Sequence, residues 1–198
     1  MNVSNSSFRG LGGQIHNFNA GPSILPRSVF EEASKAVLNF NDTGLSILEI
    51  GHRTPIFQAV MDETIALVKE LMLLEDEHEV LFLHGGASTQ FMQVPMNLLD
   101  DKETAAFTDT GVWSTKAIKE AKLFGKVEIV CSSKESNFTY IPKDFAVPND
   151  AKYLHITTNN TIYGTQWQKI PKTSNSLVAD MSSDIFSRVL DFNSFDLI

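Results

Sequence analysis

The sequence has little of what would mark several common classes of protein. It holds one cysteine, Cys131, so no disulfide can form within the chain, a pattern typical of a reducing compartment. No apolar run approaches the roughly 18 residues that a membrane-spanning helix needs, which argues against a membrane partner. Basic residues are scarce, with 16 Lys and Arg against 24 Asp and Glu and a formal net charge of −8. Because nucleic-acid-binding proteins normally carry a basic face, the charge argues against a nucleic-acid partner.

The sequence also lacks the common signatures of metal and nucleophile sites. Its five histidines show no ligand spacing such as H-E-x-x-H, and none of its many serines lies in a G-x-S-x-G elbow. Cys131 ends the apolar run 127–131, so we interpret it as a strand residue rather than a nucleophile. We therefore predict no metal site and no catalytic triad.

What remains is the composition of an ordinary globular protein, with 42% hydrophobic and 20% charged residues. A chain of 198 residues can bury roughly 70% of the surface that its unfolded form exposes, enough for a core without staples. The length allows one domain, or one domain and part of another. Residues 1–14 are rich in Ser, Asn and Gly and resemble no secretory signal, so we expect a disordered tail or a cloning remnant there.

Two helices are predicted in the first third of the chain. One opens at Pro26, where the missing N–H of proline costs nothing. The other begins at Thr54 and Pro55, a good cap and first position. The apolar faces that we expect these helices to bury are Val29, Ala33, Val37 and Phe40 for the first, and Ile56, Val60, Leu67 and Leu71 for the second.

Short apolar runs then alternate with helical segments. Helices are expected from about Gln90 and over 114–124, between runs that read as buried strands. Strands that alternate with helices indicate an α/β domain with a mostly parallel sheet flanked by helices. The predicted strands are 80–83, 104–107, 126–131, 153–157 and 177–179.

Unusual residues follow several of these strands, where open α/β sheets bind ligands. Residues 85–89, Gly-Gly-Ala-Ser-Thr, precede a helix, so their backbone N–H groups form a plausible phosphate cradle, although this motif alone favours a tight strand-to-helix turn. Trp113 offers a flat face for stacking a planar ring, or it is a core residue. Asp180 could cap the residues after it or hold a cofactor ring nitrogen protonated. Thr161 lies in a polar loop at the same edge, where it could be a simple turn residue.

His52 and Arg53 directly precede the second helix. Arg53 is one of only four arginines, and a bidentate donor beside a helix N-terminus is suited to a carboxylate or phosphate. In a chain of net charge −8, an anionic substrate needs such a local positive spot. A solvated surface arginine is the alternative.

Taken in order, these motifs resemble one family, the phosphoserine aminotransferases, which are class V, fold type I enzymes dependent on pyridoxal 5′-phosphate. The resemblance runs from about Ile15 to Ile198, and the run G-G-A-S-x-Q-F and the triplet G-H-R together are specific to it. The motifs that carry it are residues 17–22 with 25–26, 51–53, 83–91, 111–113, 160–164 and 179–183.

The resemblance implies roles for the residues singled out above. Ala87 and Ser88 would bind the cofactor phosphate through their backbone, and Trp113 would stack on the pyridine ring. Thr161 would bond the ring hydroxyl, and Asp180 would pair with the protonated ring nitrogen. Arg53, together with His52, would hold the anionic substrate.

The resemblance also implies an activity and a setting. Family members move an amino group reversibly from glutamate to 3-phosphohydroxypyruvate, giving phosphoserine and 2-oxoglutarate in serine biosynthesis. Some also act on a phosphorylated hydroxythreonine precursor of pyridoxine. They are homodimers that share their sites between subunits, and we expect a cytoplasmic protein of this kind.

One essential group has no counterpart in the chain. The family uses a lysine that forms a Schiff base with the cofactor, in an Ala-Gln-Lys-Asn context soon after a strand that here begins near Asp196. None of the twelve lysines lies at a strand end among small residues; Lys116, Lys119 and Lys122, for example, recur on one helix and look solvated. We therefore expect the catalytic lysine beyond Ile198 and predict no catalytic residue within the chain.

This expectation sets the domain prediction and the alternatives. We predict a tail over 1–14, an N-terminal segment over 15–25 and a partial large cofactor-binding domain over 26–198, without the C-terminal small domain. Such a chain would be inactive alone, a non-catalytic fragment that folds or assembles. The weaker alternative is another class V enzyme, such as an alanine–glyoxylate aminotransferase or a cysteine desulfurase-like protein, against which His52 and Arg53 argue.

Overall fold

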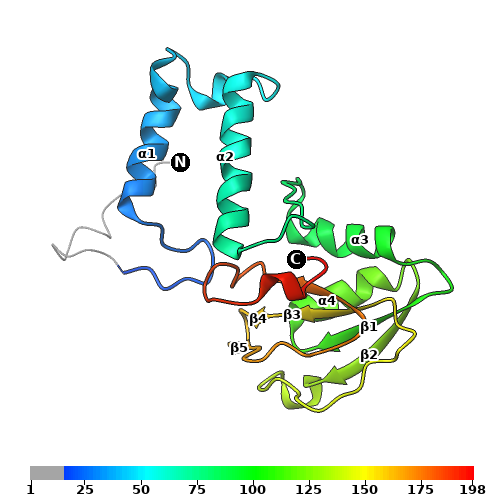
Figure 1. Cartoon of the computed structure of the whole chain (residues 1–198). Coiled ribbons are helices and arrows are strands. Elements are labelled where there is room, and N and C mark those ends of the chain that lie inside the picture. Colours follow the sequence, from blue (N-terminus) through cyan, green and yellow to red (C-terminus); the bar gives the residue numbers. More distant parts are fainter. Residues whose placement is uncertain (1–15) are drawn as a thin grey trace, which may run out of the picture. The chain divides into compact units, whose positions relative to one another are not determined.

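Residues 16–198 are described by a computed structural model of the chain (Figure 1). The tail predicted over 1–14 lies outside the described residues. The chain divides into two compact units, Met1–Phe57 and Gln58–Ile198, and the boundary falls inside a helix. Within the described part, no helix is both long enough and apolar enough to cross a membrane.

The first unit contains helix α1, two short 3₁₀ helices, η1 and η2, and the start of helix α2. Helix α1 spans Arg27–Leu38. Pro26, predicted to be its first helical residue, is instead its N-cap. Phe40, expected on the same helix, instead begins η1, which spans Phe40–Asp42. The element η2, Ile47–Glu49, is capped by Ser46, whose hydroxyl accepts from the backbone N–H of Leu48 at 3.1 Å, while the Glu49 carboxylate accepts from the backbone N–H of Ser46 at 2.9 Å.

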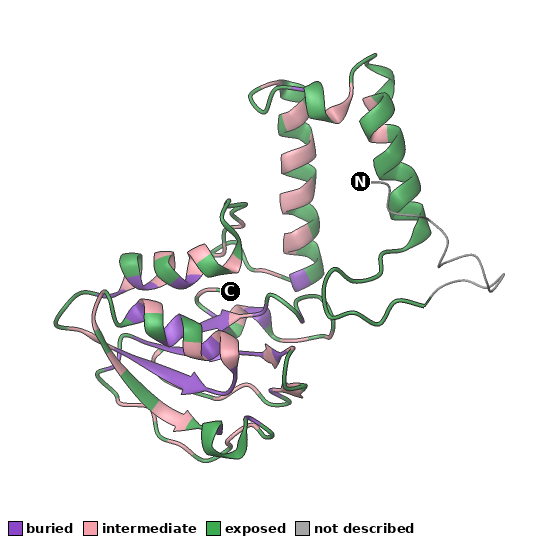
Figure 2. Cartoon of the chain, turned by 180° about the vertical axis from the view of Figure 1, so that it is seen from behind, coloured by how far each residue is buried: buried purple, intermediate pink, exposed green. Residues whose placement is uncertain are grey.

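The predicted burial of the α1 face is wrong for the described structure. The helix contains no buried residue, and Figure 2 shows it exposed almost along its whole length. Val29 and Val37 share one face of the helix, as the spacing predicts, yet each leaves nearly half of its surface exposed to solvent, 45% and 46%. A helical period identifies the apolar face of a helix, but only a neighbouring element can bury it.

Helix α2 spans Pro55–Met72 and starts where the sequence predicts. Thr54 accepts a hydrogen bond from the backbone N–H of Phe57 at 3.4 Å, the expected N-cap contact. Its predicted buried face is again wrong: Leu67 and Leu71 are exposed, and Met72 is the helix's one buried residue.

The second unit is built on a four-stranded parallel sheet in the order β2-β1-β3-β6. The strands are β1 (Thr104–Asp109), β2 (Lys126–Ser132), β3 (Tyr153–Thr157) and β6 (Ser176–Asp180). Each strand was predicted to within two residues at either end, and the α/β fold with a mostly parallel sheet is confirmed. Cys131 lies in β2, also as predicted.

Apolar side chains cover both faces of this sheet because successive residues of a strand point to opposite sides. On one face Phe107 and Tyr153 pack with helices α3 (Gly86–Leu98) and α4 (Val112–Ala121), whose buried residues include Phe91 and Ile118. On the other face, Ala106 packs in a cluster with residues of the chain that follows β5 and β6. The second cluster is centred on Leu154, Ile156, Trp167, Leu177, Phe192 and Phe195.

The strand predicted over 80–83 is absent. Those residues belong to no helix or strand, and Leu81, Phe82 and Leu83 expose 73%, 52% and 58% of their surface. No strand within residues 16–198 pairs with them, and a lone extended segment leaves its backbone groups without partners. Apolar composition alone therefore predicted a buried strand that the described residues do not form.

Two small features complete the unit. The polar loop predicted after β3 is in fact a hairpin, in which β4 (Asn159–Asn160) pairs antiparallel with β5 (Thr165–Gln166). The element η3 (Lys134–Ser136) follows β2, and η4 (Phe192–Ser194) precedes the last residues. Leu197 makes an isolated parallel bridge to Val178, so the chain is extending the sheet beside β6, as predicted for residues near Asp196.

Candidate active site

Five of the seven predicted site residues belong to the second unit and follow its strands or begin its helices. Ala87 and Ser88 lie in the first turn of α3, and Trp113 in the first turn of α4. Thr161 follows β4, and Asp180 ends β6. The parallel strands direct their carboxyl ends to one edge of the sheet, where this fold class binds ligands.

The N-terminus of α3 presents free backbone donors. Gly85 and Gly86 adopt positive φ values of 95° and 63°, a region that glycine enters without strain. The N-cap, Gly85, has no side chain to accept a hydrogen bond, and the Thr89 hydroxyl donates to the Gly85 carbonyl and accepts from none of the first N–H groups of the helix. The N–H groups of Ala87 and Ser88 therefore have no intrahelical partner and carry the positive end of the helix dipole, which suits an anion.

Trp113 and Thr161, 48 residues apart in sequence, are in direct contact. The indole Nε1 of Trp113 donates to Thr161 Oγ1 at 3.1 Å. Because the hydroxyl oxygen accepts this bond, its own proton stays free to donate to a ligand oxygen. Lys116, one turn along α4, lies with Nζ 4.3 Å from the centre of the Trp113 ring, a cation–π contact that the sequence did not reveal.

Close packing of Gly111 against Asn160 joins the loops that carry Trp113 and Thr161. A β-carbon at Gly111 would overlap the Asn160 side chain, and the glycine φ of 174° is one that any residue adopts. Asn160 is buried and donates through Nδ2 to Thr165 Oγ1 at 3.1 Å. Gly111 is thus required for close approach and not for its backbone conformation.

Asp109 fixes the start of α4 from below. Its buried carboxylate accepts hydrogen bonds from Thr115 Oγ1 at 2.7 Å and from Ser132 Oγ at 3.3 Å. An irregularity in the β1–β2 register after Phe107 places Ser132 opposite Asp109. Burial, and secondarily the Asp109 charge, raise the pKa of the Cys131 thiol to about 11, so this cysteine stays a protonated strand residue.

Asp180 keeps one carboxylate oxygen available. Its Oδ1 accepts from the backbone N–H of Ser182 at 3.1 Å and from Ser182 Oγ at 2.6 Å. Its Oδ2 receives no hydrogen bond from any described residue. The predicted capping role and an open acceptor therefore coexist in one side chain.

His155 lies beneath this edge of the sheet. It is buried on β3 and stacks on Phe107 with ring centres 4.8 Å apart. Burial lowers the pKa of His155 to about 4, although the negative charge of Asp180 partly opposes the shift. The His155 ring is therefore neutral at pH 7 and places no positive charge near Asp180.

His52 and Arg53 belong to the first unit. They lie in an exposed turn that Thr54 closes by donating its backbone N–H to the Gly51 carbonyl at 2.9 Å, immediately before α2. The Arg53 guanidinium forms no ion pair with any described residue. It is available to an anion from solvent.

Sequence reasoning missed the residues that hold the site together. Asp109 and Asn160 act through residues distant in sequence, Ser132 and Gly111. Ser114 acts locally, because its Oγ accepts hydrogen bonds from the N–H groups of Thr110 and Gly111. The local pattern around Asn160 signals only a polar turn. A usable signal did exist for Ser114, which follows Gly111 by three residues at a helix start.

Comparison with known proteins agrees with this geometry. Residues 15–197 match the family described as aminotransferase class-V, and the chain belongs to that family. The phosphoserine aminotransferase of Flavobacterium johnsoniae is 61% identical over 184 residues, which cover 92% of this chain and 52% of that protein. The resemblance predicted from the motifs is confirmed.

Solved structures give the same result. A phosphoserine aminotransferase structure that records radiation damage of its Schiff base superposes with a TM-score of 0.89 at 47% identity, covering 92% of this chain and 51% of that one. A pyridoxal-phosphate-bound phosphoserine aminotransferase from Trichomonas vaginalis gives 0.84 at 28% identity, covering 92% and 52%. The chain spans about half the length of the curated relatives it matches.

Proposed function

We propose that the protein is a phosphoserine aminotransferase, which transfers an amino group reversibly between glutamate and 3-phosphohydroxypyruvate to give phosphoserine and 2-oxoglutarate. One observation carries the proposal: the free N–H groups of α3, the Trp113–Thr161 pair and the open Asp180 oxygen belong to one compact unit of a class V aminotransferase. The 61% identity to a phosphoserine aminotransferase supports this choice within the class.

The residues present fit pyridoxal 5′-phosphate. The N–H groups of Ala87 and Ser88 would receive its phosphate, where an added β-carbon on neighbouring Gly86 meets nothing within 4 Å. Trp113 would stack on the ring, and the free Thr161 hydroxyl proton would bond its oxygen. Asp180 would hold the ring nitrogen protonated through Oδ2, and the cofactor would then supply an electron sink for the amino transfer.

Arg53 and His52 would bind the substrate anion. Arg53 is an exposed guanidinium without an ion pair, directly before the N-terminus of α2, so its charge is free for a phosphate or carboxylate. His52 adds a second donor in the same turn. This pair of donors favours a phosphorylated substrate over an uncharged one.

The Schiff-base lysine would come from outside these 198 residues. Lys116 lies beside the proposed site on α4, but it is exposed there with its Nζ against the Trp113 ring. We expect no lysine of the 198-residue chain to be trapped when it is mixed with pyridoxal phosphate and reduced with borohydride. Peptide mapping checks this, and stoichiometric labelling of Lys116 would contradict it.

The setting follows from the same proposal. The protein would act as a homodimer in the cytoplasm, in serine biosynthesis, and could extend to the phosphorylated hydroxythreonine precursor of pyridoxine. The relatives named above support the amino-transfer part of this proposal by their names and their identity to the chain.

The decisive experiment uses the protein expressed from its complete reading frame. We expect it to transaminate phosphoserine with 2-oxoglutarate, measured by coupled release of glutamate. Arg53→Ala should raise the KM for the phosphorylated substrate by roughly ten- to a hundred-fold, the effect of losing a charged hydrogen bond, with Arg27→Ala as the matched surface control. A protein without this activity would refute the proposed function, and an unchanged KM would refute the role of Arg53.

A further inference from the structure

Thr161 and Asp180, two of the proposed cofactor contacts, lie on separate segments of the chain. To bind one cofactor together, these segments must be held in a fixed position relative to each other. Thr161 lies between β4 and β5, whose pairing consists of only two residue pairs, Asn159 with Gln166 and Asn160 with Thr165. A two-stranded hairpin this short is unstable by itself. Its position relative to Asp180 must therefore come from contacts with the chain that follows β6.

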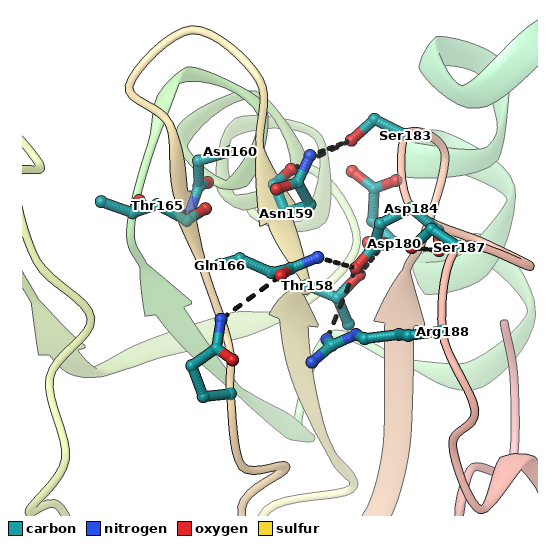
Figure 3. A network of polar contacts seen from close by, with 11 residues as sticks. Thr158, Asn159, Asn160, Thr165, Gln166, Asp180, Ser183, Asp184, Ser187 and Arg188 are labelled. Atoms are coloured by element: carbon teal, nitrogen blue, oxygen red, sulfur yellow. Dashed lines mark hydrogen bonds and ion pairs between the residues drawn. The ribbon is translucent and has the colours of Figure 1, made fainter.

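Asp184 supplies those contacts. Its carboxylate accepts from Thr158 Oγ1 at 2.5 Å, at the start of the hairpin, and from Gln166 Nε2 at 3.2 Å, at its end (Figure 3). The Asp184 side chain is only 3% exposed, and Arg188 lies 3.5 Å from Oδ2 to balance its charge. One buried carboxylate thus holds both legs of the hairpin.

Thr158 connects Asp184 to the backbone of Asp180. The Thr158 N–H donates to the Asp180 carbonyl at 3.0 Å, and its hydroxyl oxygen lies 3.1 Å from the same carbonyl. A hydroxyl carries one proton, and the shorter contact to the charged Asp184 is the stronger hydrogen bond. Asp184 itself is fixed by its own N–H, which donates to the Met181 carbonyl at 3.1 Å.

We propose that Asp184 is a positioning residue of the cofactor site, which holds the hairpin 158–166 on the turn after β6 and so sets Thr161 against Asp180. The proposal rests on the proposed function for the identity of the cofactor, but the link itself is a property of this chain. Asp184→Asn tests it because the amide is neutral and keeps one acceptor oxygen, so an NH₂ group must replace either the oxygen that accepts from Thr158 or the one that accepts from Gln166 and Arg188.

The first test needs no cofactor. In the 198-residue chain, Asp184→Asn should raise amide hydrogen exchange over 158–166 by roughly ten- to a hundred-fold, while β1 and β3 keep the wild-type rates. Asp191→Asn is the matched control, since Asp191 is exposed in the same segment and its carboxylate bonds no described residue. Faster exchange over the whole sheet would overturn the proposal, because it would make Asp184 a general stabiliser.

A second pair of variants keeps the proposal testable if Asp184→Asn does not fold. Thr158→Val keeps the shape of the side chain and loses its hydroxyl, whereas Thr158→Ser keeps the hydroxyl. We expect Val to reproduce the local increase in exchange and Ser to restore protection. Equal exchange in the two variants would overturn the link through Thr158.

The last test uses the protein expressed from its complete reading frame. Asp184→Asn and Thr158→Val should weaken pyridoxal phosphate binding by roughly ten- to a hundred-fold and shift the pH midpoint of the bound cofactor's visible absorption band, while Thr158→Ser and Asp191→Asn stay near wild type. Unchanged affinity and pH midpoint in both variants would overturn the proposal. A wild-type protein that binds no pyridoxal phosphate would refute the proposed function, and the exchange data would then decide the positioning role alone.

Discussion

Two short segments of the second unit, β1 and residues 80–83, differ in burial in the opposite sense to their hydrophobicity. The strand β1 reads Thr-Ala-Ala-Phe-Thr-Asp, with only three apolar residues in six, yet five of its residues are buried. Residues 80–83 read Val-Leu-Phe-Leu and are mostly exposed, with no assigned strand. Burial here follows from having neighbours on both sides and not from hydrophobicity.

The difference is one of pairing. The backbone of β1 lies between β2 and β3 and bonds to both, and helices and loops cover its two faces. No described strand pairs with 80–83, so its N–H and C=O groups lie in water. The three predictions below test this contrast between a paired strand and an unpaired segment that leads to the same site.

Truncating one phenylalanine in each segment gives the largest contrast. Phe107→Ala should lower the free energy of unfolding by about 3–5 kcal/mol, because Phe107 is 2% exposed between Tyr153 and His155. Phe82→Ala should change it by less than about 0.5 kcal/mol, as for other surface positions. Urea denaturation of the 198-residue chain measures both, and equal losses would show that residues 80–83 are packed in solution.

The same contrast explains how much of the fold could be predicted. The four strands of the sheet were found because each contains a short apolar run between turn residues, although only β1, β3 and β6 are largely buried and β2 has no buried residue. The run 80–83 has the same local pattern, so periodicity could not separate it from them. The exposed faces of α1 and α2 were mispredicted for the same reason, since sequence shows an apolar face but not what covers it.

The site was predictable by chemistry but not by contact. Trp113, Thr161 and Asp180 were noticed because each is an unusual residue type after a strand. The hydrogen bond between Trp113 and Thr161 spans 48 residues and could not be read from local spacing. Asp184 was missed because a single aspartate in a turn looks like solvated surface until Thr158 and Gln166 are brought to it.

The pH dependence of stability should distinguish the paired strand from the unpaired segment through their histidines. The pKa of His155 on β3 falls from 6.5 to about 4 on folding, because burial disfavours its charge more than Asp180 favours it. Between these pH values the unfolded chain binds a proton that the folded chain does not. The free energy of unfolding should therefore drop as pH falls from 6.5 to 4, by up to about 1.4 kcal/mol per pH unit.

Variants at two positions assign that slope. His155→Gln should reduce the slope of the unfolding free energy against pH by the contribution of about one bound proton. His84→Gln, in the exposed chain after residues 80–83, should leave this slope unchanged. Denaturation curves at half-unit pH steps give the comparison. A slope that survives in His155→Gln would assign the acid sensitivity to other groups.

Replacing the glycines that follow the two segments by alanine should lower the free energy of unfolding for two different reasons. These are the smallest of the three expected effects. Gly111→Ala, after β1, should cost about 1–3 kcal/mol because its β-carbon meets the Asn160 side chain. Gly86→Ala, after residues 80–83, meets nothing within 4 Å and should cost about 1–2 kcal/mol through its positive φ alone. The two costs overlap, so their size cannot separate the two causes.

Coupling to Asn160 does separate them. If the Gly111 cost is a clash, shortening the partner with Asn160→Ala must return part of it, giving a favourable interaction energy of about 1 kcal/mol in a double-mutant cycle. The same cycle with Gly86→Ala should be additive within about 0.5 kcal/mol, because strain at a backbone dihedral does not depend on a distant side chain. Additivity in both cycles would mean that the loop after β1 can move away from Asn160. The paired strand would then hold its own residues in place without fixing the loop that carries Trp113.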